Sequence, residues 1–141
     1  MKNFVSIVLL LVGTMRLYAQ APASPDPNAP VITFDAESID FGNVTQGSDA
    51  VRTFTFTNTG KTPLVISSIK GQCGCTTVSD WPKDPIPPGG KGTFKVKYDT
   101  SIRVGMFDKQ IMVYSNAATA VMTVKIKGNV VPAGSSATGG N

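Results

Sequence analysis

VRTFTFT, the stretch from Val51 to Thr57, decides the fold, because it carries an aromatic ring at alternate positions. Phe54 and Phe56 alternate with threonines, and a period of two is the pattern of a β-strand with one dry face. The same alternation returns in FKVKY, which begins at Phe94, and in AVMTVKIK, which begins at Ala120. We therefore expect these three segments to be half-buried strands.

Shorter apolar segments separated by turn residues complete the pattern. Further strands are predicted at Val31 to Phe34, Ser38 to Phe41, Leu64 to Ile69 and Gln110 to Tyr114. The breaks are rich in Asn, Gly and Pro, as at Asn58 to Lys61 and Pro87 to Gly90. No window of helical length keeps an apolar stripe, so helix should be scarce. The prediction is an all-β, antiparallel sandwich of about seven strands.

The first residues are predicted to be a signal peptide, residues 1–19. Lys2 precedes the apolar run from Phe4 to Val12. Leu17-Tyr18-Ala19 then places small or neutral residues where signal peptidase cuts. Cleavage after Ala19 is preferred, with Ala21 as the second choice and an uncleaved anchor as the alternative. No cysteine lies near the cut, so no lipobox is indicated. The expected location is periplasmic or secreted, without a transmembrane segment after signal removal.

The rest of the chain divides by composition into three parts. Residues 20–30 hold four prolines and are expected to be an extended spacer. Residues 31–131 carry the strand pattern and are expected to form one domain. Residues 132–141 are rich in Gly and Ser and are expected to be a flexible tail.

Charge and composition exclude several classes of function. Lys2 and Arg16 leave with the signal peptide, which lowers the 13 basic residues to 11 against 9 acidic ones, a net charge of +2. The strand lysines alternate with apolar residues instead of forming a basic face, so no nucleic-acid partner is expected. The chain has no histidine, which excludes Ser-His-Asp and Cys-His catalysis. We expect no enzyme, no catalytic residues and no cofactor.

Two series of short motifs carry a family resemblance. The first resembles the opening of Hydin-like and major-sperm-protein-like immunoglobulin domains and comprises Asp40 to Val44, Gly47, Phe54 to Gly60, and Pro63-Leu64. The second resembles bacterial domain-of-unknown-function family 1573 and comprises Cys73 to Thr77, Trp81-Pro82, Pro85-Ile86, Pro88-Gly89, Gly92, Tyr98 to Thr100, Arg103, Gly105, Phe107, Lys109, and Ser115 to Ala117. The resemblance implies an immunoglobulin-like antiparallel β-sandwich in exported bacterial proteins and implies no activity.

Cys73 and Cys75 are the two cysteines of the chain and are a candidate disulfide, since export places them in an oxidising compartment. A bond between them closes almost no loop and adds little stability through chain entropy, and its small ring favours reduction. We favour a pair that stiffens its loop. The alternatives are a soft-metal site for Cu(I) with Cys73 and Cys75 as ligands, thiol exchange, and intermolecular pairing.

Trp81 and Arg103 are the candidate partner-binding residues, on loops expected at Gly71 to Pro88 and Thr100 to Asp108. Trp81 is expected to cap the sandwich core, with an exposed aromatic contact as the alternative. Arg103 has nearby acids with which it could pair, Asp99 and Asp108. The basic residues that pilus chaperones use are not matched, so that role is not inferred.

Two further residues are expected to shape the backbone. Gly42, directly after Phe41, suits a bulge or a turn at which the chain crosses between sheets. Asp99, directly after Tyr98, suits a turn in which its carboxylate accepts nearby backbone N–H groups.

The sequence thus predicts an exported, non-enzymatic, immunoglobulin-like module with a structural or protein-binding role and an unidentified protein partner. The alternative from another class of function is a thiol-redox or Cu(I)-handling protein that uses the Cys73-Gly74-Cys75 turn.

Overall fold

The alternating apolar and polar residues become strands that are dry on one face and wet on the other. In the computed structural model, which describes residues 26–134, β6 shows a strict alternation of exposed and buried residues. The eight strands are β1 (Ile32–Phe34), β2 (Ser38–Thr45), β3 (Ala50–Asn58), β4 (Ile66–Gly71), β5 (Thr76–Ser79), β6 (Lys91–Tyr98), β7 (Gly105–Ser115) and β8 (Val121–Val131).

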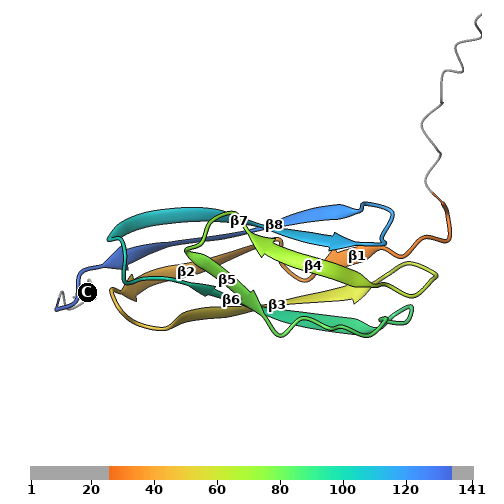
Figure 1. The fold of residues 1–141 in the computed structure, drawn as a ribbon, viewed down its shortest axis with the longest axis horizontal. Helices are drawn as coiled ribbons and strands as arrows, with labels where there is room; N and C mark the ends of the chain where they lie inside the picture. The colour runs from red at the N-terminus through yellow and green to blue at the C-terminus, as the bar shows by residue number, and fades with distance from the viewer. Residues whose placement is uncertain (1–25, 135–141) are drawn as a thin grey trace, which may run out of the picture.

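The strands form two four-stranded sheets that face each other (Figure 1). One sheet has the order β1-β3-β6-β5 and the other the order β2-β8-β7-β4. All pairs are antiparallel except β2 and β8, which are parallel. The sandwich predicted from the sequence is confirmed, and the parallel pair is a feature that the alternation could not show, because both pair types have the same side-chain period.

Each of the seven expected strands is present, and one strand was missed. β5 lies within the segment from Gly71 to Pro88 that was expected to be a single loop. It is only four residues long and sits at a sheet edge, where alternation is too short to stand out. Likewise β7 begins at Gly105, so the loop expected at Thr100 to Asp108 ends earlier. Residues 26–134 contain no helix, as expected.

Aromatic rings fill the interior between the sheets. Phe54 and Phe94 are opposite each other on β3 and β6 and stack with ring centroids 5.2 Å apart. Tyr98 on β6 stacks on Phe107 on β7 with centroids 3.8 Å apart, so this pair joins one sheet to the other. All four rings are buried. An aromatic pair such as Phe54 and Phe94 contributes about 0.5–1.5 kcal/mol beyond area burial.

Gly42 makes the predicted bulge but does not carry the chain between sheets. Its φ is +63°, and the pairing of β2 with β8 shifts register between Asp40 and Asn43. The Asp40 carboxylate accepts the Gly42 N–H at 2.8 Å. The crossing lies earlier, in residues 35–37 between β1 and β2, so the crossing expected at Gly42 is wrong. A positive φ is suited to a bulge and does not by itself indicate a change of sheet.

Asn58, at the end of β3, is a fully buried polar residue with a complete set of hydrogen bonds. Its Oδ1 accepts the N–H groups of Val31 and Gly60 at 3.3 and 3.0 Å. Its Nδ2 donates to the carbonyls of Thr62 and Ile86 at 2.8 and 3.0 Å. The side chain therefore ties together three loops at the end of the sandwich opposite the Cys73–Cys75 turn.

Replacing Asn58 with Ala should lower the free energy of unfolding by roughly 3 kcal/mol, because four buried backbone groups lose their partner. Urea unfolding followed by circular dichroism measures this loss. Asn43→Ala is the control, since Asn43 is exposed and makes one side-chain bond, to Asn129. The control should cost less than about 1 kcal/mol. Equal losses in the two variants would contradict the role assigned to Asn58.

Candidate functional site

One end of the sandwich gathers the features that the sequence singled out, except Trp81. The strand directions bring the β2–β3 turn, the Cys73–Cys75 turn and the β6–β7 connection to this end (Figure 1). We call it the cysteine end. The described chain begins at the opposite end, with Asp26.

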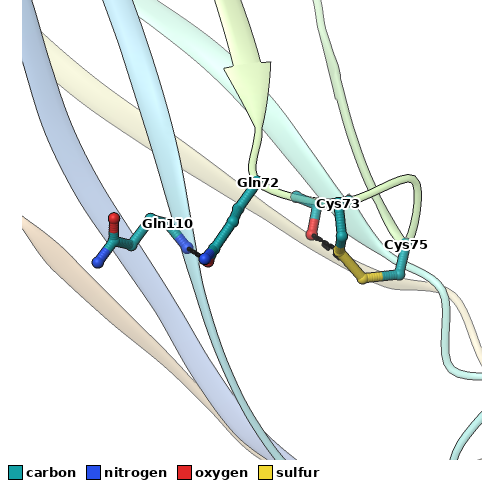
Figure 2. The surroundings of a disulfide bond; sticks show 5 residues. Gln72, Cys73, Cys75 and Gln110 are labelled. Carbon is teal, nitrogen blue, oxygen red and sulfur yellow. Dashed lines mark hydrogen bonds between the residues drawn. A yellow bond between two sulfur atoms is a disulfide. The ribbon is translucent and has the colours of Figure 1, made fainter.

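The two cysteines lie where the chain crosses from β4 in one sheet to β5 in the other. Figure 2 shows their sulfur atoms joined as a disulfide. The two Cα atoms are 5.2 Å apart. The turn is fixed on both sides. Gln72 exchanges two hydrogen bonds with the backbone of Gln110 on β7, and the Cys75 carbonyl accepts the Asp99 N–H at 2.8 Å. A turn anchored to both sheets holds the sulfurs in one place.

Thr76 places a buried hydroxyl beside both sulfurs. Its residue is 6% exposed, and its Oγ1 lies 3.6 Å from the Cys73 sulfur and 4.0 Å from the Cys75 sulfur. A hydroxyl can rotate to donate to either sulfur. It is therefore positioned to stabilise a thiolate on either cysteine.

The sulfurs border a pocket of about 240 Å³ that also contains Arg103. The β6–β7 connection supplies Asp99, Ile102 and Arg103, while β7 supplies Lys109. Tyr98 lines the same pocket and links it to the core through its stack on Phe107. The structure thus brings the candidate disulfide and one candidate partner-binding residue into one hollow.

Arg103 does not pair with the acids expected for it. The Asp99 carboxylate accepts hydrogen bonds from the backbone N–H and the hydroxyl of Ser101, at 2.9 and 2.5 Å. These two bonds hold the pKa of Asp99 below its usual range, and the bond from the hydroxyl has the larger effect. The predicted Asp99 turn is confirmed, and the carboxylate is used locally. Among residues 26–134, no ion pair involves Arg103 or Lys109.

A second hollow of about 490 Å³ is lined by residues of β2, β7 and β8. Met106 and Phe107 of β7 line it, together with Asp40 of β2 and Lys127 of β8. Alternate residues of the β6–β7 connection and of the start of β7 expose large apolar side chains. We call these the apolar ridge: Ile102 at 65%, Val104 at 51% and Met106 at 91% exposure.

Trp81 lies apart from the cysteines, because β5 separates them. Asp80, directly after β5, has a φ of 59°. Trp81 is then half-buried against the core, as expected for a capping residue. The Lys83 ammonium lies 3.3 Å from the ring centroid, over its face. A partner-binding role for Trp81 stays a prediction.

The Cu(I) alternative gains no third ligand at the pocket. Met106 lies on the apolar ridge, Met112 accepts the Tyr114 hydroxyl at 3.6 Å, and Met122 packs against the core. No methionine is among the residues that line the pocket of the cysteines. Within residues 26–134, no group of three or more His, Cys, Asp or Glu side chains is arranged to hold a metal ion.

Three residues of this site were not predicted. Gln72 and Thr76 flank the cysteines in sequence, but nothing in their type indicates that they contact Gln110 and the sulfurs. Lys109 belongs to a strand of alternating residues and becomes part of the site only because β7 passes the Cys73–Cys75 turn.

The family of the chain is decided by a match over the whole sandwich. The family described as "Protein of unknown function (DUF1573)" matches residues 32–130. The chain belongs to this family. No curated protein matches. In the described residues of this family member, no helix is long and apolar enough to cross a membrane.

Solved structures share the fold of this family member at low sequence identity. A protein of unknown function from Porphyromonas gingivalis W83 is 18% identical with a TM-score of 0.63, over 78% of this chain and 51% of that one. The PapD-like domain 7 of human CEP192 is 13% identical with a TM-score of 0.58, and the match covers 84% of this chain and 98% of that one. The Pseudomonas aeruginosa CupB2 chaperone is 12% identical with a TM-score of 0.52, and the match covers 70% of this chain and 55% of that one. The chain spans about half the length of the Porphyromonas protein.

Replacing Ser101 with Ala should raise the pKa of Asp99 toward its usual range, because the hydroxyl bond favours the ionised carboxylate. A lowered folded-state pKa contributes stability that is present at neutral pH and is lost as the pH falls through that pKa. NMR titration of the carboxyl carbons measures the shift. Asp49, whose pKa is lowered by its bond to Lys97, is the internal control and should not change. A parallel change at Asp49 would contradict this assignment.

Proposed function

We propose that the protein is an exported, non-enzymatic, immunoglobulin-like module that binds another protein through the apolar ridge at its cysteine end. The observation that carries this proposal is the exposure of three large apolar side chains at alternate positions, Ile102, Val104 and Met106.

The ridge has the properties of a contact surface. Single exposed apolar residues are ordinary, but neighbouring ones cost free energy in water and are typical of protein contacts. Met106 is almost fully exposed, and methionine adapts its shape to different partners. Ile102 also lines the pocket of the cysteines and Met106 lines the larger hollow, and these hollows would receive side chains of the partner.

The positive charges near the ridge indicate the charge of the partner surface. Arg103 lies within the ridge segment and Lys109 borders the adjacent pocket, and neither has an acidic partner within residues 26–134. By contrast, three strand lysines do pair with acids, at Lys95–Asp80, Lys97–Asp49 and Lys127–Asp40. A partner surface that places carboxylates beside an apolar patch would complement this end of the sandwich.

The fold supports a binding role by analogy alone. A chaperone and a PapD-like domain are among the proteins that share it. At such identities the likeness extends to the architecture and not to a mechanism.

A photo-cross-linking side chain at position 106 should attach to another protein in the native cell envelope. The same side chain at position 121 is the matched control, because Val121 is also exposed and apolar but lies at the opposite end. Gels and mass spectrometry compare the two products. Equal cross-linking at both positions would refute a partner at the ridge.

Export makes a separate prediction about residues 1–19, which lie outside the described part of the chain. The purified protein should begin at Gln20, because signal peptidase requires small residues before the cut. Mass spectrometry of the N-terminal peptide shows this directly. A protein that keeps Phe4 to Val12 would contradict cleavage and favour an anchor.

A further inference from the structure

The pocket of the cysteines contains sulfur chemistry that protein docking does not require. Cys73 and Cys75 line it together with Arg103 and Lys109, which form no ion pair within residues 26–134, and with one carboxylate, that of Asp99. The Thr76 hydroxyl lies in reach of both sulfurs. Both cysteines are partly exposed residues that line the pocket, so a small molecule can reach them.

We propose that Cys73 and Cys75 form a thiol–disulfide exchange site that accepts a small anionic thiol, with Thr76, Arg103 and Lys109 as positioning residues. This inference does not depend on the protein partner proposed above.

The anchored turn supplies the first requirement, which is a disulfide that forms and breaks without disturbing the fold. The pair closes a ring across one intervening residue, so its loss changes chain entropy little. The hydrogen bonds from Gln72 to Gln110 and from Asp99 to Cys75 do not involve the sulfurs. The turn therefore keeps its place in both redox states.

The surrounding groups supply the second requirement, which is a stable leaving thiolate. The Thr76 hydroxyl is placed to donate to whichever sulfur leaves. Arg103 and Lys109 line the same pocket and outnumber its one carboxylate, that of Asp99, and nearby cations favour a thiolate over a thiol. The same cations attract an anionic thiol into a hollow of about 240 Å³, which suits a small molecule.

The reaction balances with the thiol as reductant. The thiolate attacks one cysteine sulfur, a mixed disulfide forms, the Cys73–Cys75 bond breaks, and its electron pair leaves on the other cysteine as a thiolate. A second thiolate attacks the sulfur of the bound small molecule, the mixed disulfide breaks, and the cysteine that held it leaves as a thiolate. The products are the oxidised small disulfide and two reduced cysteines, which take up the two protons that the thiols released.

The test compares two reductants of similar size, anionic 3-mercaptopropionate and neutral 2-mercaptoethanol. The purified protein is first treated with oxidised glutathione, and a mass deficit of about two daltons shows the bond. The rate of reduction is then measured with each thiol, and the ratio of the two rates gives the preference for the anion. Using the ratio cancels differences in the reactivity of the cysteines.

In the double variant Arg103→Gln/Lys109→Gln, the preference for 3-mercaptopropionate should fall about tenfold, because the attraction to the anion is lost. In Thr76→Val, which keeps the side-chain shape, both rates should fall by a similar factor of about five, because the leaving thiolate loses its donor whichever thiol attacks. Lys61→Gln removes a cation from the opposite end and should change neither rate nor preference.

Two results would overturn the proposal. One is the absence of the bond after treatment with oxidised glutathione. The other is a preference that is unchanged in the double variant, or that falls equally in Lys61→Gln. Circular dichroism of each variant confirms that the sandwich is retained, so a loss of rate cannot be assigned to unfolding.

Discussion

The stack of Tyr98 on Phe107 is the interaction on which the cysteine end depends. It joins β6 in one sheet to β7 in the other, with the ring centroids 3.8 Å apart. Tyr98 also lines the pocket of the cysteines, and Phe107 lines the larger hollow. The apolar ridge runs from the connection between these two strands into the start of β7, so the stack holds together the strands that carry the ridge and line the hollows.

The paired cysteines and the exposed apolar side chains of the apolar ridge both occur where the chain crosses from one sheet to the other. The Cys73–Cys75 turn lies between β4 and β5, and the apolar ridge begins between β6 and β7 and ends in the first residues of β7. The strands themselves present an apolar interior and a surface of threonines and lysines. A rigid interior of this kind allows connections to carry reactive or apolar groups without loss of the fold.

Periodicity predicted the architecture well and the site only in part. The alternation at Phe54 and Phe94 requires a dry face, so seven of the strands followed from the sequence. The four residues of β5 are too few for alternation, which is why Trp81 and the cysteines were expected on one loop. That Arg103 and Lys109 would meet the cysteines depends on which strands become neighbours, and spacing along the chain does not contain this information.

The parallel pairing of β2 with β8 places the two ends of the described chain at opposite ends of the sandwich. It makes the last strand run toward the cysteine end, while the described chain starts at the far end, near Asp26. An attachment ahead of Asp26 would therefore hold the sandwich at the end opposite the cysteines. The sulfurs and the exposed methionine would then face away from the point of attachment, toward whatever approaches from outside.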